Sequence, residues 1–211
     1  MQGFKTEGVI LKRRNFGEAD RIISIFSKKE GKISILARGV RKITSRRAGN
    51  VELLNRVIVF LHPGKNFHIL TEAETLNSYQ KIKEDLTLST YAYHIIELID
   101  KLLVENQENI FVYHDLLEVL QRLELTPRQI YIRAFEVKIL ARMGFWSLDQ
   151  VHQVKIEILN ILDNLENLSW MQIDKLEINK EQAQELEMIL RNYLEKVLEK
   201  RLHSREFLKK L

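Results

Sequence analysis

The stretch that decides the fold runs from Glu7 to Arg46 and reads EGVILKRRNFGEADRIISIFSKKEGKISILARGVRKITSR. It contains short runs of Val, Ile and Phe in which apolar and polar residues partly alternate, separated by turn residues such as NFGEAD (15–20) and KKEG (28–31). This pattern is typical of β-strands, because successive side chains of a strand point to opposite faces. The stretch therefore predicts three consecutive strands joined by short turns.

The same pattern continues on both sides of this stretch, as far as about residue 74. A longer polar segment, KITSRRAGN (42–50), follows the third strand. Short strands with one long connection favour a small closed barrel over a sandwich, and we expect an OB-type barrel, with an SH3-like barrel as the alternative. The five predicted strands are Lys5–Arg14, Arg21–Ser27, Lys32–Arg38, Arg56–His62 and Phe67–Glu74.

A helical pattern replaces the strand pattern after Asn77. Apolar residues recur there with a period near 3.6, the repeat of an amphipathic helix. Stripes of Leu, Ile and Tyr predict a first helix over 88–102 and a second over 113–123. A weaker pattern predicts a helix over 151–162, and the last helix is expected over 180–203. The barrel is therefore expected to be followed by an all-α part.

Residues typical of helix ends mark a further, central helix and the start of the last helix. In a central helix, Thr126 stands at the expected N-cap, Pro127 at the first helical position and Gly144 just beyond the end. Apolar residues surround this helix on all sides, so we expect it to be buried. Asn179 and Gln182 have the spacing of a capping box, which predicts the start of the last helix.

Composition divides the chain at the same place as the periodicity. Residues 1–76 contain 15 Lys and Arg against 7 Asp and Glu, a net charge of +8, whereas residues 77–211 contain 18 against 22, a net charge of −4. Seven of the eight glycines also lie in the first part. We therefore predict an α+β fold of two domains, a five-stranded OB-type β-barrel in residues 1–76 and an all-α helical domain in residues 77–211.

Several classes of function are excluded by what the 211 residues lack. The sequence has no cysteine, which rules out disulfides, thiolate metal sites and cysteine nucleophiles and suits a reducing cytosol. The longest uncharged run, Leu86 to Ile96, has eleven residues, short of the ~20 that span a bilayer. The HPGKN segment (62–66) is not a P-loop, and no GxSxG or HExxH motif occurs. We predict an intracellular protein that is not an enzyme, holds no metal and needs no cofactor.

The strongest functional signal is a basic cluster after the third predicted strand. In Arg38–Arg47, RGVRKITSRR, five of ten residues are Lys or Arg and none is acidic. Lys32 and Ser34 are expected to point outward from the strand beside this cluster. A row of cations of this kind binds along a phosphodiester backbone, because each neutralised phosphate releases counterions. The predicted nucleic-acid-binding residues are Lys12, Arg13, Arg14, Lys32, Arg38, Arg41, Lys42, Arg46 and Arg47.

Two weaker features accompany the basic cluster. Phe16 lies in a predicted turn, where an exposed aromatic ring can stack on nucleobases. Arg128, Lys138 and Arg142 lie within an arc of about 80° on the central helix, at 100° per residue. Beside the apolar residues of that helix they form a candidate site for an acidic peptide with hydrophobic residues. The alternative is that these cations simply extend from a buried helix to solvent.

Taken together, these residues resemble the RecO family of recombination mediators. The resemblance rests on an ordered set: a strand, GEAD (17–20), a second strand, GK (31–32), then ARGVRK (37–42) followed by Ser-Arg (45–46). It continues with KILARMGF (138–145) and with the closing LHSREFLKKL (202–211), which is similar to the SR-FL ending of the family. The set covers nearly the whole chain in the order of the family.

The resemblance implies an OB barrel, a helical domain, binding to single- and double-stranded DNA, and annealing of complementary strands. As partners it implies single-strand-binding protein, RecR and, indirectly, RecA, in a cytoplasmic, nucleoid-associated protein without a membrane partner. By position, the DNA surface would be the basic cluster with Lys12, Arg13, Arg14 and Lys32. Many family members have a four-cysteine zinc site soon after the position of Gly144, which this cysteine-free sequence cannot form. The structure of residues 146–176 is therefore the least predictable.

We accordingly predict a non-enzymatic mediator of DNA repair and homologous recombination that helps to load recombinase on DNA coated by single-strand-binding protein. Two alternatives stay open. One is an RNA-binding OB-fold protein, because a backbone-binding barrel accepts either nucleic acid. The other is a protein-interaction adaptor whose basic loop binds an acidic protein rather than a nucleic acid.

Overall fold

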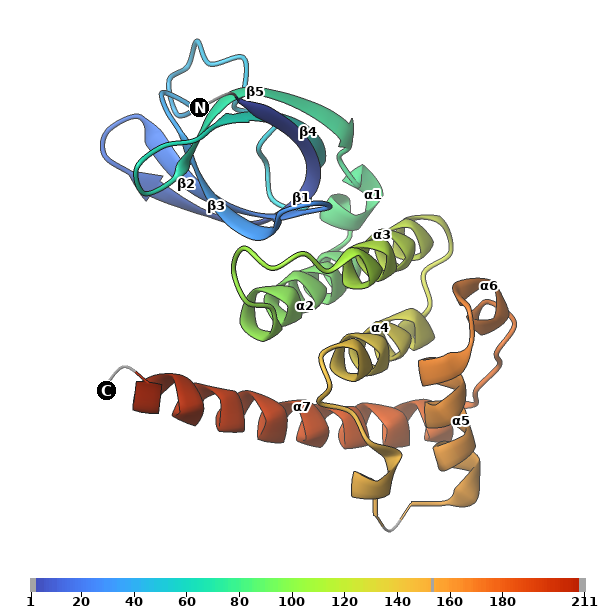
Figure 1. Cartoon of the computed structure of the whole chain (residues 1–211). Helices are drawn as coiled ribbons and strands as arrows, with labels where there is room; N and C mark the ends of the chain where they lie inside the picture. The colour runs from blue at the N-terminus through green and yellow to red at the C-terminus, as the bar shows by residue number, and fades with distance from the viewer. Residues whose placement is uncertain (1–2, 153, 209–211) are drawn as a thin grey trace. The chain divides into compact units, whose positions relative to one another are not determined.

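The computed structural model describes residues 3–152 and 154–208. The chain divides into two compact units, residues 1–114 and 115–211. The first unit holds all five strands, which form a ring in Figure 1. The compositional break after residue 76 falls at the end of the last strand, so the first unit also includes helical residues. The strands are β1 (Phe4–Phe16), β2 (Asp20–Ser27), β3 (Gly31–Ala37), β4 (Arg56–His62) and β5 (His68–Asn77).

The five strands close into a barrel in the order β1-β2-β3-β5-β4. Neighbouring strands are antiparallel except β3 and β5, which pair in parallel at Ile35 with His68 and Leu36 with Ile69. This order, with the parallel β3–β5 pairing reached through a long connection, is that of an OB barrel, so the OB-type fold is confirmed and the SH3-like alternative is excluded.

The strand β1 closes the barrel because it pairs on both sides. Its first part pairs with β4 and its second part with β2, and the β2 register shifts between Ile10 and Lys12. Val9, Ile10 and Leu11 are all buried, which breaks the alternation of a regular strand. The irregularity lets a 13-residue strand bend around the core.

The barrel core also fixes the long loop between β3 and β4, residues 38–55. Val40 and Val51 of this loop belong to the same buried cluster as Ile23, Ile35 and Leu61 of the strands. The Asn50 side chain donates a hydrogen bond of 2.7 Å to the Ala73 carbonyl. The loop is therefore packed against the barrel by its own side chains.

A polar cluster ties the first unit together at the start of α3 (Ile110–Leu125). The Tyr113 hydroxyl donates to Glu7 Oε1 at 2.9 Å, and Arg56 Nε donates to the same oxygen at 2.7 Å. Burial opposes ionisation of Glu7, but the hydrogen bonds from Arg56 and Tyr113 outweigh burial and hold the pKa of Glu7 below its ordinary value. Two helices lie wholly within this unit, α1 (Gln80–Glu84) and α2 (Leu86–Leu102), whereas α3 continues into the second unit.

The second unit is built around α4 (Gln129–Arg142), whose residues are buried on all sides, as predicted for a central helix. Gly144 ends this helix with φ +71°, while Phe145 N donates to Leu140 O at 2.8 Å. The prediction of Thr126 as N-cap is wrong. The helix begins two residues after Pro127, because Arg128 is extended and donates to the backbone carbonyls of Asp174 and Leu176.

The remaining helices follow α4 in order. The helix predicted over 151–162 is instead α5 (Ile156–Asn167), preceded by the 3-10 turn η1 (Leu148–Gln150) and followed by α6 (Trp170–Ile173). The last helix, α7 (Lys180–Leu208), begins with the predicted capping box, in which Gln182 N donates to Asn179 Oδ1 at 2.9 Å. Of the closing family motif, residues 209–211 lie outside the described residues.

Candidate nucleic-acid interface

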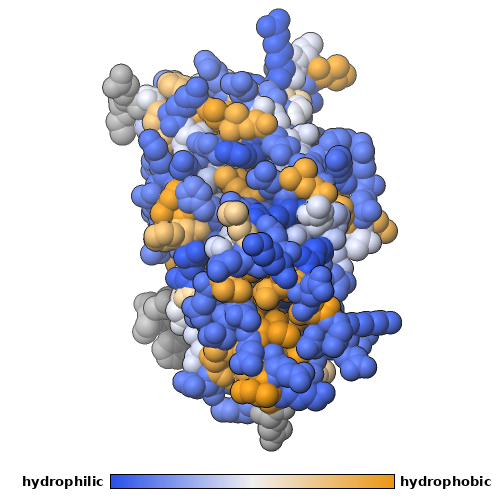
Figure 2. Space-filling view, turned by 90° about the vertical axis from the view of Figure 1, so that its right-hand side faces the viewer, coloured by the Kyte–Doolittle hydropathy of each residue, from blue (hydrophilic) through white to orange (hydrophobic). Residues whose placement is uncertain are grey.

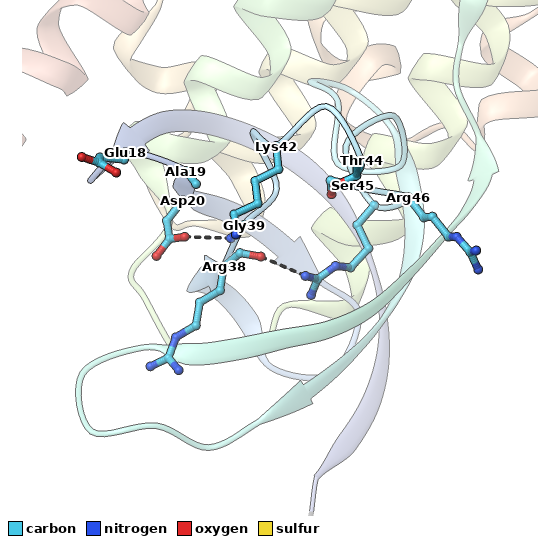
Figure 3. Close-up of a pocket in the computed structure, with 10 residues that line it drawn as sticks. Glu18, Ala19, Asp20, Arg38, Gly39, Lys42, Thr44, Ser45 and Arg46 are labelled. Carbon is cyan, nitrogen blue, oxygen red and sulfur yellow. Dashed lines mark hydrogen bonds between the residues drawn. The ribbon is translucent and has the colours of Figure 1, made fainter.

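The basic cluster lines an open hollow of about 840 Å³ in the first unit. Figure 3 shows its walls, which come from two segments of the chain. The turn between β1 and β2 and the start of β2 supply one wall, and the loop after β3 supplies the other. The lining residues are Glu18, Ala19, Asp20, Arg38, Gly39, Lys42, Thr44, Ser45, Arg46 and Arg47.

Three hydrogen bonds, each with at least one backbone partner, join the two walls. Gly39 N donates to Asp20 Oδ1 at 2.7 Å, the contact drawn in Figure 3. Arg41 N donates to Ala19 O at 2.9 Å, and Arg41 Nη1 donates to Gly17 O at 3.3 Å. Gly39 has a φ of +64°, a conformation that glycine adopts without strain. The positions of the cations in ARGVRK are therefore fixed by a specific turn and its hydrogen bonds.

Arg47 holds the base of the loop. Its Nη1 donates to Leu70 O at 2.7 Å and to Thr71 O at 3.3 Å, and its Nη2 donates to Arg38 O at 2.8 Å. The planar guanidinium fork is suited to reaching several acceptors at once. Because these donors are used within the chain, Arg47 positions the loop, and its neighbour Arg46 is the arginine that is exposed.

Six of the nine predicted nucleic-acid-binding residues have exposed side chains. Lys12 is 67% exposed on its side chain, and its Nζ lies 3.9 Å from Asp100 Oδ2, a distance that leaves the amine accessible. Arg13 differs, because it forms an ion pair with Glu52, which also lies 3.6 Å from Arg21. The exposed set is Lys12, Arg14, Arg38, Arg41, Lys42 and Arg46.

The expectation that Lys32 lies on an open cationic wall is wrong. Lys32 is only 4% exposed, and its amine donates to the Asp100 carbonyl and, at 3.3 Å, to Asp100 Oδ1. Its side chain does point away from the barrel core, but Asp100 of α2 covers it. An outward strand position is a solvent position only where no helix packs on the sheet, and strand alternation alone carries no information on that.

The structure also adds two carboxylates to a cluster that is free of acids in sequence. Glu18 and Asp20 line the hollow together with Arg38, Lys42, Arg46 and Arg47. The Asp20 carboxylate accepts the Gly39 N–H, whereas Glu18 is exposed. Both acids belong to the GEAD motif, so the turn that organises the loop also lowers the positive charge of the hollow.

The three cations of the central helix contact the second unit itself. Lys138 is 7% exposed and donates to the carbonyls of Glu166 and Leu168 at 3.0 and 2.8 Å. Burial lowers the pKa of Lys138. Arg142 pairs with Asp115, and Arg128 caps the backbone after α6 as described above. The expectation of a free cationic face is therefore wrong, because Arg128 and Lys138 bind carbonyls of the chain after α4 and Arg142 pairs with Asp115 of α3.

Other parts of the second unit keep an open surface. A hollow of about 630 Å³ is lined by Arg122, Leu125, Arg128, Tyr131, Met171 and Asp174, among others. Leu125 and Met171 are 63% and 75% exposed. Figure 2 shows hydrophobic side chains gathered in the lower half of its view. Hydrogen bonds from Arg122 hold the pKa of Asp174 below its ordinary value.

Residues 146–176 do not fit a cysteine-type zinc site, since the sequence contains no cysteine. Among the described residues, no group of three or more His, Cys, Asp and Glu side chains is arranged to hold a metal ion. Two tryptophan side chains of this segment donate hydrogen bonds to carboxylates. Trp146 Nε1 donates to Glu166 Oε2 at 2.8 Å, and Trp170 Nε1 donates to the buried Asp115 at 2.9 Å.

A closed OB barrel with exposed cations around a hollow, followed by a helical part, defines a candidate nucleic-acid-binding protein of the OB class. Two family models match the sequence: Recombination protein O N terminal over residues 1–79 and Recombination protein O C terminal over residues 83–152. The chain belongs to the RecO family of DNA repair proteins. The family predicted from the ordered motifs is thus confirmed. In the part of the chain that the structure describes, no helix has both the length and the apolar character to cross a membrane.

Relatives named DNA repair protein RecO match the chain over different lengths. The protein of Acetivibrio thermocellus is 36% identical over 148 residues, 69% of this chain and 59% of the relative. That of Roseiflexus sp. is 34% identical over 143 residues, 67% of this chain and 50% of the relative. The chain thus spans between half and three fifths of these two proteins. The protein of Pelotomaculum thermopropionicum is 27% identical over 241 residues, 99% of this chain and 94% of the relative.

Proposed function

We propose that this chain binds DNA backbones through its exposed loop cations and mediates recombinational repair by annealing complementary strands. The observation that carries the proposal is the exposure of Arg38, Arg41, Lys42 and Arg46 on a loop held in place by core residues and by Arg47. A loop that is already ordered loses little entropy on binding.

The contacts available at the hollow suit backbone binding without sequence preference. Exposed guanidinium and ammonium groups neutralise phosphates, and such contacts carry no information on base sequence. Neutralisation on one protein surface lowers the repulsion between two complementary strands, which is the barrier that annealing has to overcome. The chain itself therefore supplies charge and geometry, and the bases of the two strands supply the specificity of pairing.

The salt dependence of binding to a 30-nucleotide single strand tests the proposal. If the six exposed cations each neutralise one phosphate, log Kd plotted against log salt changes with a slope of magnitude about 4, from ~0.7 per phosphate. Replacing Arg38, Arg41, Lys42 and Arg46 by Gln should reduce this magnitude to about 1.4.

In the matched control, four exposed lysines outside the hollow are replaced by Gln. They are Lys5, Lys81, Lys175 and Lys180. This variant has the same change in net charge and should keep the slope of the wild type. Equal slopes for the two variants would show that only net charge matters and would contradict a localised site. Competition with RNA of equal length separates the RNA-binding alternative, because RNA recognition usually involves the 2′-hydroxyl.

We also propose that the helical unit contacts partner proteins, among them single-strand-binding protein and RecR, and acts indirectly on RecA. The support is the hollow beside Arg128, where Leu125 and Met171 expose large apolar side chains. These side chains suit the hydrophobic residues of a peptide partner. Titrating the acidic tail of single-strand-binding protein against Met171→Glu, with DNA absent, tests this; binding equal to that of the wild type would contradict it.

A further inference from the structure

Two large apolar side chains flank the cationic hollow and are exposed to solvent. Ile43, in the loop after β3, is fully exposed, with a relative exposure of 105%, and Phe16, at the end of β1, is 47% exposed. Each comes from a different wall. Ile43 directly precedes the lining residue Thr44, and Phe16 lies two residues before the lining residue Glu18.

The backbone under both side chains is fixed. Ile43 lies inside a turn closed by the hydrogen bond of 2.9 Å from Ser45 N to Lys42 O. Phe16 pairs with Asp20 at the end of the β1–β2 hairpin, and the next carbonyl, Gly17 O, accepts from Arg41 Nη1. Arg41 therefore joins the two segments that carry these apolar residues, and both segments are held by hydrogen bonds.

The residue type of Ile43 is unusual for its position in the turn. Central turn positions are generally occupied by Gly, Asn, Asp, Ser or Pro, for which an apolar β-branched residue such as Ile43 is a poor substitute. A single exposed apolar residue needs no explanation by itself. What indicates a ligand is the setting, because Ile43 directly follows the cations Arg41 and Lys42, and Arg14 lies two residues before Phe16.

A single strand of DNA matches this alternation of chemistry. Its phosphates are anionic and its unpaired bases present flat apolar faces, so binding surfaces for single strands combine cations with aromatic platforms. Apolar side chains such as Phe and Ile also insert between bases of nucleic acids in proteins that unstack them. A protein partner would instead need acidic groups beside apolar ones, at two places on the rim.

We propose that Phe16 and Ile43 contact the unstacked bases of a single DNA strand whose phosphates are held by the neighbouring cations. This inference rests on the proposed DNA binding and goes beyond it, since it predicts a preference for single strands that comes from two apolar residues. Bases held apart in this way are available for pairing with a second strand. In a duplex the base faces are stacked, so these two side chains have no comparable ligand there.

The test compares the Phe16→Ala and Ile43→Ala double variant with the wild type on two oligonucleotides of equal length. One is oligo-dT, and the other is an abasic strand with the same phosphates and no bases. Base stacking is worth enough that loss of one platform costs about fivefold or more in affinity. We expect the double variant to bind oligo-dT at least fivefold more weakly, with an unchanged salt slope and unchanged affinity for the abasic strand.

The matched control is Leu86→Ala, since Leu86 is 84% exposed in α2 of the same unit and flanks no hollow residue. Thermal denaturation of all variants verifies that the exposed substitutions leave folding unchanged. If the wild type binds dT and abasic strands equally and the double variant equals it, backbone binding stands and the base contacts are refuted. If the wild type binds neither, both proposals fail. If the variant loses only a protein partner, the surface is a protein-docking site and the base contacts are refuted.

Discussion

The adjacent arginines Arg46 and Arg47 are predicted to have opposite roles, although they are the same residue type. Arg47 donates to the carbonyls of Leu70, Thr71 and Arg38, one of which is part-buried. Charge-assisted hydrogen bonds contribute more than neutral ones, and exposure discounts two of the three, so Arg47→Ala should destabilise the first unit by about 2 kcal/mol. For a chain of this size that is a decrease in Tm of roughly 4–8 °C.

The substitutions Arg46→Ala and Arg47→Ala should also differ in their effect on DNA binding. Arg46→Ala should leave Tm unchanged and reduce the magnitude of the salt slope on single strands by about 0.7, because one phosphate contact is lost. Arg47→Ala should weaken DNA binding because the loop is less ordered. The salt slope should stay that of the wild type, because no phosphate contact is lost. Arg47→Lys keeps the charge and loses the fork, so it should behave like Arg47→Ala.

Thermal denaturation followed by circular dichroism, together with fluorescence anisotropy at several salt concentrations, measures both effects. A wild-type Tm for Arg47→Ala, together with the reduced slope expected for Arg46→Ala, would contradict these two roles. In that case Arg47 contacts phosphate, and its hydrogen bonds to the barrel contribute nothing measurable.

Three further predictions concern single residues. Glu18→Gln should strengthen binding to single-stranded DNA about twofold, because it removes one screened repulsion at the hollow; weaker binding would show that Glu18 contributes a contact. Glu7→Gln should destabilise the fold by about 1–3 kcal/mol at pH 7. Since the folded pKa of Glu7 is lowered, this difference should be lost as the pH falls below about 4.5, and denaturation at several pH values measures it. Lys138→Met should destabilise the fold by about 1–3 kcal/mol, because the half-buried carbonyls of Glu166 and Leu168 lose their donor; unchanged denaturant unfolding would contradict this.

The barrel could be predicted from sequence because its signals are local. Alternation within each strand, glycines in the turns and one long polar connection are all properties of short segments, and the observed β4 has the predicted bounds, Arg56–His62. The signal for the end of α4 is also local, since Gly144 adopts the φ that ends a helix. The start of α4 has no local signal, because Arg128 is held by residues about 46 positions away.

The candidate site could be predicted in charge but not in detail. Lys32 and Lys12 both lie on β1–β3 strands as outward cations, yet only Lys32 is covered by α2. Nothing in the residues around Lys32 indicates which helix packs on its strand. Likewise, counting charges cannot show that Arg46 and Arg47 have different roles or that Glu18 lies beside the basic loop. Both facts depend on how the β1–β2 turn packs against the loop.

The exposed apolar residues illustrate the same limit. Phe16 stands out in sequence as an aromatic residue in a turn, whereas Ile43 looks like one more apolar residue of a loop that also buries Val40 and Val51. Only the placement of the loop against the barrel shows which of these three side chains is left outside the core.

Strand annealing tests the central claim, that the exposed loop cations bring DNA backbones together. The measurement is the rate at which complementary oligonucleotides coated with single-strand-binding protein form duplex, with wild type, the variant in which Arg38, Arg41, Lys42 and Arg46 are Gln, and the four-lysine control. We predict acceleration by the wild type and the control and its loss in the loop variant. Equal acceleration by all three proteins, or none by the wild type, would contradict the claim.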